Sequence, residues 1–276
     1  MPGTFPPVSL LQRGAVMARR LLSWLLRQDL FVIASVGALA ALTWAFAEIA
    51  DAVREEETRS VDESVLRALR SDPAGLDPIG PDWVTRAMVD LSALGSPAVT
   101  TLIVIVVAGF LLLGKKPRLA LLVIASALAT TGSMLALKEL FERGRPAIVA
   151  RVVEENGLSF PSGHAAVSAA LYTTIGVLLA RTVPGTRLRV YVVLVSVVVA
   201  LLIGATRVYL GVHYPTDVVA GWTLGAAVAL TCGVAARALE RRGLVESGPN
   251  DPRAPFTSSE PRAQPPSAPP GSSPTR

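Results

Sequence analysis

The chain has 276 residues, of which 51% are hydrophobic and 17% are charged, and its mean hydropathy is +0.50. Soluble domains carry roughly 25% charged residues, so this composition argues against a soluble protein and indicates a membrane protein. The net charge of +5 is modest. Its basic residues lie at the ends of apolar runs, which indicates membrane topology and argues against a nucleic-acid partner.

Six apolar runs predict membrane-spanning helices, because each approaches the roughly 20 residues that cross a bilayer as a helix. The fourth and fifth are short, and flanking residues can extend them. The runs are Leu30–Ala50, Ser96–Gly114, Leu119–Leu137, Ala165–Ala180, Val190–Ala205 and Val218–Ala236. We therefore expect an all-α fold in which residues 30–238 form a bundle of six transmembrane helices. Residues 1–29 would be an N-terminal segment and residues 239–276 a disordered, Pro/Ser-rich tail.

The lysines and arginines predict how these helices are oriented. Basic residues precede the first run, join the second to the third and the fourth to the fifth, and follow the sixth. By the positive-inside rule these four segments are cytoplasmic, which places both termini there in a multi-pass protein of the plasma membrane. The acidic segment Asp51–Gly95 and the segments 138–164 and 206–217 then lie on the extracytoplasmic face.

The first run also resembles a cleaved signal peptide, since arginines precede it and Ala45-Phe46-Ala47 matches a cleavage site. It exceeds the about 7–15 residues of a signal core, so a retained span is the stronger interpretation.

Segment 51–95 predicts two short surface helices, which cover an external site or pack over helix ends. Their apolar faces consist of Val61, Val65, Leu66 and Leu69 in one helix and Trp83, Ala87, Met88 and Leu91 in the other.

The chain has only two histidines, His164 and His213, and both fall in external segments beside glycine, proline and arginine. Imidazole exchanges a proton near neutral pH and can also act as a nucleophile. The scarcity and the setting of these two side chains indicate a role in chemistry.

The first polar motif, Lys138 to Pro146, follows the third run. Lys138 and Arg145 are seven residues apart and would share a helix face, and Pro146 disfavours helical geometry at Arg145, so the helix is predicted to end there. A lysine on the last turns and an arginine on the emerging loop suit a small anion such as phosphate. Cations that snorkel at a helix C-terminus are the structural alternative.

The second motif, Pro161-Ser162-Gly163-His164, opens the fourth run. Ser162 is predicted to be the N-cap, and Gly163 permits a ligand to approach the backbone closely. The free N–H groups of this helix start favour an anion beside His164. The alternative is a helix cap followed by an interfacial histidine that has no role in catalysis.

The third motif runs from Thr206 to Asp217. Arg207 ends the fifth run, and Pro215 suits the first turn of the sixth. His213 therefore precedes a helix N-terminus, where Asp217 can accept a hydrogen bond from its ring and leave the other nitrogen free to attack. A first-turn acid and a membrane-edge arginine are the structural alternatives.

Together the motifs place three cations, two histidines, one carboxylate and two helix N-termini on one membrane face. This set suits phosphoryl transfer through a phosphohistidine. The cations and N–H groups would stabilise the phosphate oxygens, one histidine would attack, and the other would protonate the leaving oxygen.

These residues resemble the membrane-bound type 2 phosphatidic acid phosphatases, or lipid phosphate phosphatases. The family pattern is a lysine, six residues and Arg-Pro, then Pro-Ser-Gly-His, then Ser-Arg, five residues, His, three residues and Asp. Every spacing fits, and the one departure is Thr206 in place of serine, which keeps the hydroxyl. The resemblance covers about residues 50 to 236. Soluble acid phosphatases and vanadate haloperoxidases resemble the same core, and the apolar runs favour the lipid phosphatases.

The resemblance implies a six-helix core with its site at the membrane surface and a reaction without metal ion or cofactor. His213 would be the nucleophile, Asp217 its orienting partner and His164 the general acid. The phosphate-binding residues would be Lys138, Arg145, Ser162, Gly163 and Arg207.

We therefore expect an integral membrane phosphatase for a lipid phosphate or diphosphate. Phosphatidic acid, phosphatidylglycerol phosphate and undecaprenyl diphosphate are the candidate substrates. Its partners would be that lipid and the bilayer, without nucleic acid, and the oligomeric state stays open. One alternative is a transferase of the same family that uses an acceptor other than water. Another is a non-catalytic transporter, against which the two histidines and Asp217 argue.

Overall fold

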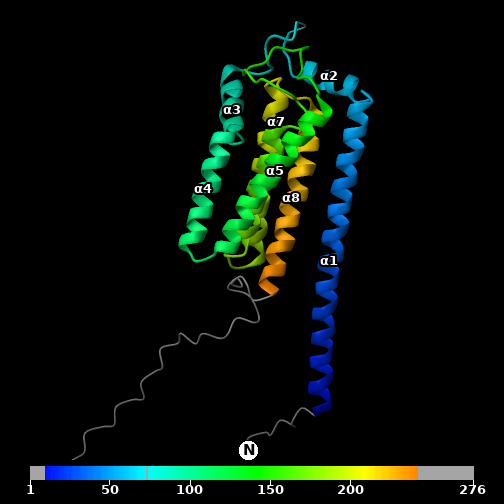
Figure 1. Cartoon of the computed structure of the whole chain (residues 1–276), viewed down its shortest axis with the longest axis vertical. Coiled ribbons are helices and arrows are strands. Elements are labelled where there is room, and N and C mark those ends of the chain that lie inside the picture. The colour runs from blue at the N-terminus through cyan, green and yellow to red at the C-terminus, as the bar shows by residue number, and fades with distance from the viewer. Residues whose placement is uncertain (1–9, 73, 242–276) are drawn as a thin grey trace, which may run out of the picture.

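A computed structural model describes residues 10–72 and 74–241, and their ordered secondary structure is a bundle of helices plus one isolated β-bridge (Figure 1). The expected all-α class is thereby confirmed. The helices are α1 (Leu10–Arg54), α2 (Arg59–Ala68), α3 (Asp82–Ala93), α4 (Pro97–Leu113), α5 (Pro117–Phe141), α6 (Gly163–Ala180), α7 (Thr186–Tyr209) and α8 (Pro215–Arg241).

Five of the six apolar runs lie wholly within helices, and the second, Ser96–Gly114, is α4 with its two capping residues. Five described helices are long and apolar enough to cross a membrane, and α3 with α4 makes a sixth span if their 46° bend is counted within it. Flanking residues do extend the short runs, since α6 has 18 residues and α7 has 24. The chain is therefore a multi-pass membrane protein.

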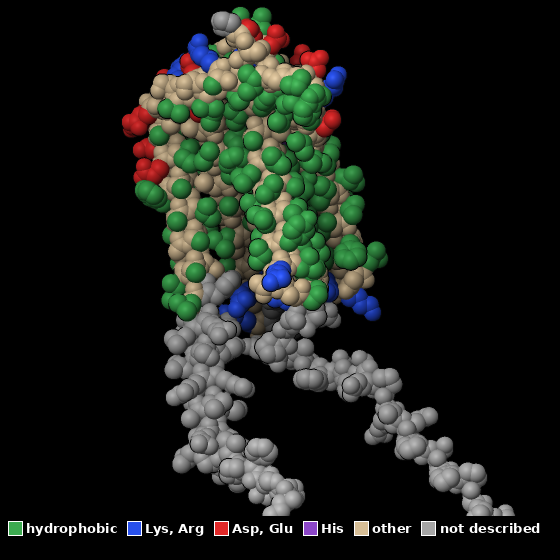
Figure 2. Space-filling model, turned by 180° about the vertical axis from the view of Figure 1, so that it is seen from behind, with side chains coloured by type: hydrophobic (Ala, Val, Ile, Leu, Met, Phe, Trp, Pro, Cys, Tyr) green, Lys and Arg blue, Asp and Glu red, His purple; other side chains and the backbone are tan. Residues whose placement is uncertain are grey.

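The outer surface of the bundle is suited to lipid. Figure 2 shows a broad band of hydrophobic side chains between one end where Asp and Glu gather and another where Lys and Arg appear. Phe110 and Leu113 of α4 are 74% and 88% exposed. A water-soluble surface rarely presents a contiguous apolar area of this kind.

Helix α1 is longer than its apolar run. It begins at Leu10, so residues 10–29 of the predicted N-terminal segment are helical and lead directly into the span Val32–Arg54. Near its C-terminal end, Ala50 and Val53 pack in a cluster with Phe160 and Ala220. Residues 1–9 and 242–276 lie outside the described residues, and so does most of the tail predicted to be disordered.

Helix α6 lies at the centre and packs against α5, α7 and α8. Its contact with α8 depends on two glycines of α8. A Cβ atom on Gly221 would lie 2.6 Å from the carbonyl oxygen of Ser162, and one on Gly225 would lie 2.3 Å from that of Ala166. Small residues spaced in this way let transmembrane backbones meet directly.

The two helices predicted in segment 51–95 form, as α2 and α3, but their buried faces differ from expectation. In α2, Leu66 is completely buried whereas Val61 is 61% exposed. Helix α3 packs on α7, where Met88 contacts the cluster that contains Leu210, and Trp83 is exposed. Helix α2 crosses the end of the bundle, whereas α3 prolongs α4 with a bend of 46° between them (Figure 1).

Candidate active site

His213 is completely enclosed in the short connection between α7 and α8. Gly211 in this turn has a φ of 75°, a conformation that favours glycine. Helix α8 starts immediately afterwards, which places Asp217 in its first turn. The Nδ1 atom of His213 is 3.4 Å from Oδ2 of Asp217. The predicted pair is therefore adjacent, but Nδ1 makes no hydrogen bond to any described residue.

The other ring nitrogen of His213 faces Arg145, whose Nη1 is 3.1 Å from Nε2. Because a guanidinium only donates hydrogen bonds, Nε2 accepts, and the ring proton lies on Nδ1 toward Asp217. Burial lowers the pKa of His213 to about 4, although Asp217 opposes the shift. The ring is thus neutral at pH 7, the form in which imidazole can attack phosphorus.

Arg145 reaches this position from the loop after α5. The prediction that the helix continues to Arg145 is wrong, because α5 ends at Phe141 and Glu142 adopts the left-handed region with a φ of 45°. Burial lowers the pKa of the Arg145 guanidinium, and the nearby Arg151 adds to this. The side chain donates hydrogen bonds to the backbone carbonyls of Asn156, Gly157 and Val212.

The other two predicted cations come from helix ends. Arg207, at the end of α7, is buried and its Nη1 lies 2.5 Å from the hydroxyl oxygen of Ser92 in α3. Lys138 remains on the last turn of α5, as expected, and donates to the carbonyl of Leu158 at 2.8 Å. The hydroxyl of Thr206 donates to the carbonyl of Ile203 within α7, so the family serine position has a local structural contact here.

The second motif opens α6 as predicted, with Ser162 at the N-cap position. Its hydroxyl makes no capping hydrogen bond, however, and Oγ is buried without a partner among the described residues. The backbone of Ser162 donates to the carbonyl of Asp217 at 2.9 Å, which joins the starts of α6 and α8. A Cβ atom on Gly163 would lie 2.7 Å from Sδ of Met134, so a larger residue there would require the Met134 side chain to shift.

Glu155 lies between the predicted catalytic and phosphate-binding side chains. Its carboxylate forms an ion pair with Arg207, and its Oε2 is 3.4 Å from Nη1 of Arg145. Its Oε1 is 3.9 Å from Nδ1 of His164. Three residues singled out by the motifs thus converge on one negatively charged group.

Comparison with known proteins identifies the family. The sequence model of the PAP2 superfamily matches residues 118–240, a range that contains every predicted site residue. Phosphatidylglycerophosphatase B of Bacillus subtilis is 36% identical over 186 residues, which cover 65% of this chain and 85% of that protein. The chain belongs to the PAP2 superfamily.

Further relatives support the membrane-bound PAP2 branch. The crystal structure of a transmembrane PAP2-type phosphatidylglycerolphosphate phosphatase from Bacillus subtilis matches with a TM-score of 0.67 and 27% identity, over 74% of this chain and 98% of that chain. Decaprenylphosphoryl-5-phosphoribose phosphatase of Mycobacterium tuberculosis is 35% identical over 129 residues, or 46% of this chain and 66% of that protein. Undecaprenyl-diphosphatase of Sulfolobus acidocaldarius is 40% identical over 67 residues, or 24% and 28%. The chain is a membrane-bound PAP2 phosphatase.

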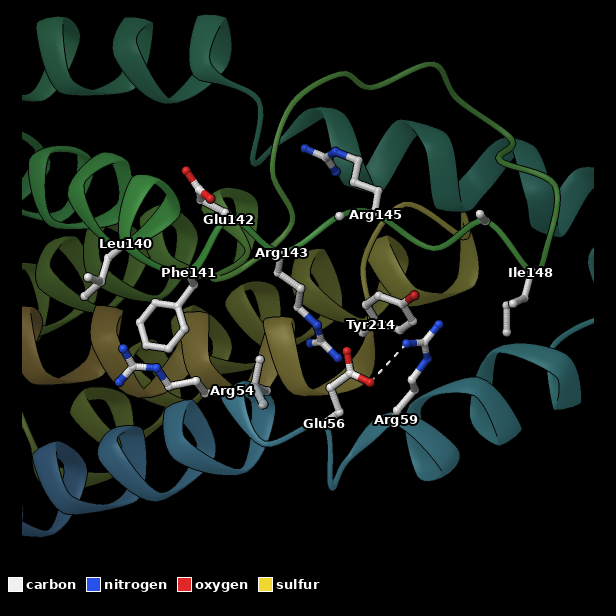
Figure 3. A pocket seen from close by; sticks show the side chains of 13 residues that line it. Arg54, Glu56, Arg59, Leu140, Phe141, Glu142, Arg143, Arg145, Ile148 and Tyr214 are labelled. Atoms are coloured by element: carbon white, nitrogen blue, oxygen red, sulfur yellow. Dashed lines mark hydrogen bonds and ion pairs between the residues drawn. The ribbon is translucent and has the colours of Figure 1, made fainter.

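Several polar residues of this PAP2 site were not predicted. Glu155 carried no signal, because it is one of several acids in an irregular loop. Ser92 and Asp62 come from helices that precede the motifs by many residues. Arg143 lies inside the first motif, two residues before the predicted phosphate ligand Arg145. Its place in that motif is the sequence signal that could have pointed to it. Figure 3 shows that Arg143 and Arg145 leave the loop in opposite directions.

The site is chemically suited to an anion. Its cations come from α5, α7 and the loop between α5 and α6, and the buried Ser162 hydroxyl adds an unpaired donor. Within residues 10–72 and 74–241, no three His, Cys, Asp or Glu side chains are grouped as a metal site would require.

Proposed function

We propose that this protein hydrolyses a lipid phosphate monoester or diphosphate through a phosphohistidine on His213. The observation that carries the proposal is the environment of its imidazole, which has Asp217 on the Nδ1 side and Arg145 on the Nε2 side. A neutral ring with its proton toward a carboxylate directs its Nε2 lone pair toward Arg145, one of the cations that would hold the phosphate.

In the first step Nε2 of His213 would attack phosphorus, and the bond from phosphorus to the lipid oxygen would break. With a monoester, His164 would give that oxygen a proton, so the alcohol leaves neutral. With a diphosphate, the bond that breaks is the one to the bridging oxygen, and the lipid monophosphate leaves with that proton. In the second step a water molecule would attack the phosphohistidine while His164 takes its proton. Inorganic phosphate then leaves, and His213 returns to its neutral form.

Lys138, Arg145 and Arg207 would bind the phosphate oxygens, together with the backbone N–H groups of Ser162 and Gly163. The substrate phosphate would take the place of the Glu155 carboxylate between the two arginines. Fixed donors of this type typically contribute a factor of about 10² to 10³ each to the rate.

Replacing Glu155 with glutamine should tighten inhibition by inorganic phosphate about tenfold, because a neutral amide competes less strongly for Arg145 and Arg207. The inhibition constant is measured from phosphate release at increasing phosphate concentration. Glu154→Gln is the matched control, since Glu154 is exposed in the same loop. Unchanged or weaker inhibition in the Glu155 variant would show that its carboxylate does not occupy the phosphate site.

The substrate class follows from the location of the site at one end of the apolar bundle. There the phosphate would reach the cations while the hydrocarbon chain stays in lipid. The distribution of basic residues supports an extracytoplasmic site with both termini in the cytoplasm. We also retain 1–29, 30–238 and 239–276 as the N-terminal segment, phosphatase domain and cytoplasmic tail.

A substrate panel in the presence of EDTA tests the proposal directly. Purified protein in detergent is assayed with phosphatidic acid, phosphatidylglycerol phosphate and undecaprenyl diphosphate. We expect phosphate release from at least one of them at the same rate with and without chelator, because the proposed mechanism uses cations of the protein alone. A strict magnesium requirement, or no release from any of the three, would contradict the proposal.

A further inference from the structure

Arg143 connects two buried carboxylates on the side of His213 that faces away from Arg145. Its Nη1 is 2.5 Å from Oδ1 of Asp217, and its Nη2 is 2.8 Å from Oδ2 of Asp62. Both carboxylate side chains are 0% exposed, and that of Arg143 is 15% exposed. The guanidinium also lies over the ring of Tyr214, 4.3 Å from its centroid, where Figure 3 shows the two side chains together.

The ion-pair bridge from Asp217 through Arg143 to Asp62 is held at its Asp62 end by Thr216. Asp62 accepts hydrogen bonds from the backbone N–H and the hydroxyl of Thr216, at 3.0 and 2.6 Å. The same hydroxyl accepts a hydrogen bond from Nη1 of Arg143 at 2.8 Å. Burial alone would lower the pKa of Arg143, but the carboxylates of Asp217 and Asp62 outweigh it and raise the pKa. The guanidinium is therefore charged and fixed at both ends.

The bridge determines which oxygen of Asp217 faces the imidazole. Oδ1 accepts from Arg143, while Oδ2 accepts from the backbone N–H of Tyr214 at 2.9 Å and lies beside Nδ1 of His213. A rotation of the carboxylate would break both hydrogen bonds. Arg143 and Arg145 point in opposite directions from their loop (Figure 3), and it is Arg145 that meets Nε2 of the ring.

We propose that Arg143 is a positioning residue for phosphoryl transfer, which holds Asp217 so that its Oδ2 orients and polarises the His213 ring. The inference rests on the proposed role of His213 as nucleophile. It assigns opposite tasks to two arginines of one motif, since Arg145 would bind phosphate whereas Arg143 would act through Asp217. Outer partners that orient metal-bound histidines change activity by about 10- to 100-fold when they are removed, and we expect an effect of that size here.

The charge of Arg143 gives the inference a signature that a purely structural role would lack. A positive charge near the dyad disfavours the protonated imidazole, and a negative charge favours it. Removing Arg143 should therefore move the acid limb of the kcat/KM profile to higher pH, and removing the charge of Asp62 should move it to lower pH. The charged groups that act directly on the His213 ring are Asp217 (α8), Arg145 (loop between α5 and α6) and Arg207 (α7). The other charged or titratable groups of the site are Lys138 (α5), His164 (α6), Asp62 (α2), and Arg143 and Glu155 of the same loop.

The experiment compares Arg143→Gln, Arg143→Lys and Asp62→Asn with wild-type protein on its best substrate from the lipid panel. For Arg143→Gln we expect kcat to fall about 10- to 100-fold with a nearly unchanged KM, and the acid limb to rise. Arg143→Lys should keep the acid limb near that of wild type, because the charge remains, while kcat falls. Arg59→Gln is the control, since Arg59 is 59% exposed at the same end of the molecule and forms ion pairs with Glu56 and Glu63.

The inference is overturned if Arg143→Gln keeps wild-type kcat, or loses activity without any shift of the acid limb. If that variant does not fold, Asp62→Asn and Arg143→Lys decide, and the inference fails if the acid limb of Asp62→Asn does not move downward. Phosphoenzyme trapping on the wild-type protein distinguishes a failure of the inference about Arg143 from a failure of the proposed function. A trapped phosphohistidine with an unaffected Arg143→Gln variant refutes only the role of Arg143, whereas a wild-type protein without one refutes the proposed function.

Discussion

Replacement of His213 by alanine is expected to abolish turnover, with a loss of at least about a thousandfold in kcat. The enzyme would lose the nitrogen that forms the bond to phosphorus, and the chain has only one other histidine. Phosphate release measures the loss. A rapid quench with labelled substrate into alkali, where a phosphoramidate survives, measures the covalent intermediate.

This variant needs a control for folding, because His213 is buried. Its loss leaves a cavity beside the buried Asp217 carboxylate and removes the imidazole that lies next to it. His213→Gln retains most of the side-chain volume, and the thermal unfolding midpoint in detergent shows whether either variant is folded. Labelled phosphate that remains attached to a folded His213 variant would refute the assignment of the nucleophile.

Replacement of His164 by alanine is expected to slow the release of an alkyl leaving group by about 10² to 10⁴. The lipid alkoxide is a poor leaving group unless it receives a proton as the bond breaks. An aryl phosphate with an acidic phenol, such as p-nitrophenyl phosphate, does not need that proton. The measurement is therefore the ratio of kcat values on a lipid phosphate and on p-nitrophenyl phosphate.

The wild-type ratio is the reference for this comparison, and Arg207→Gln is the matched control. Arg207 would bind phosphate in both reactions, so its loss should slow the two substrates to a similar degree. An equal loss on both substrates in the His164 variant would assign that histidine to phosphate binding and remove its role as an acid.

The sequence was sufficient to predict the helices and to single out motif residues that lie close together in the structure, because period and spacing carry that information. Apolar runs located the spans, and the motif spacing singled out His164, His213 and Asp217. The structure brings His213 beside Asp217 and Arg145, and places Arg207, Arg145 and His164 around one carboxylate. The roles assigned to these residues remain predictions for the experiments above.

What the sequence could not predict depends on tertiary contacts. Glu155 meets the two arginines only after an irregular loop folds back over the bundle end. Asp62 reaches Arg143 because α2 crosses that end, a placement that no local pattern encodes. The end of α5 was misplaced because a left-handed residue, Glu142, ended the helix before the proline signal was reached.

The glycine contacts between α6 and α8 bear on how the site responds to its membrane. Gly221 and Gly225 bring the two backbones together beside Ser162, and the N–H of Ser162 donates to the carbonyl of Asp217. The side chains at these contacts are the methyl groups of Ala165 and Ala169, so a change of bilayer thickness or helix tilt would find little to repack there. We therefore expect α6 and α8 to move as one body. The distance between His164, the proposed acid, and His213, the proposed nucleophile, would then stay constant when the bilayer deforms, while α4 and α1 adapt at the periphery.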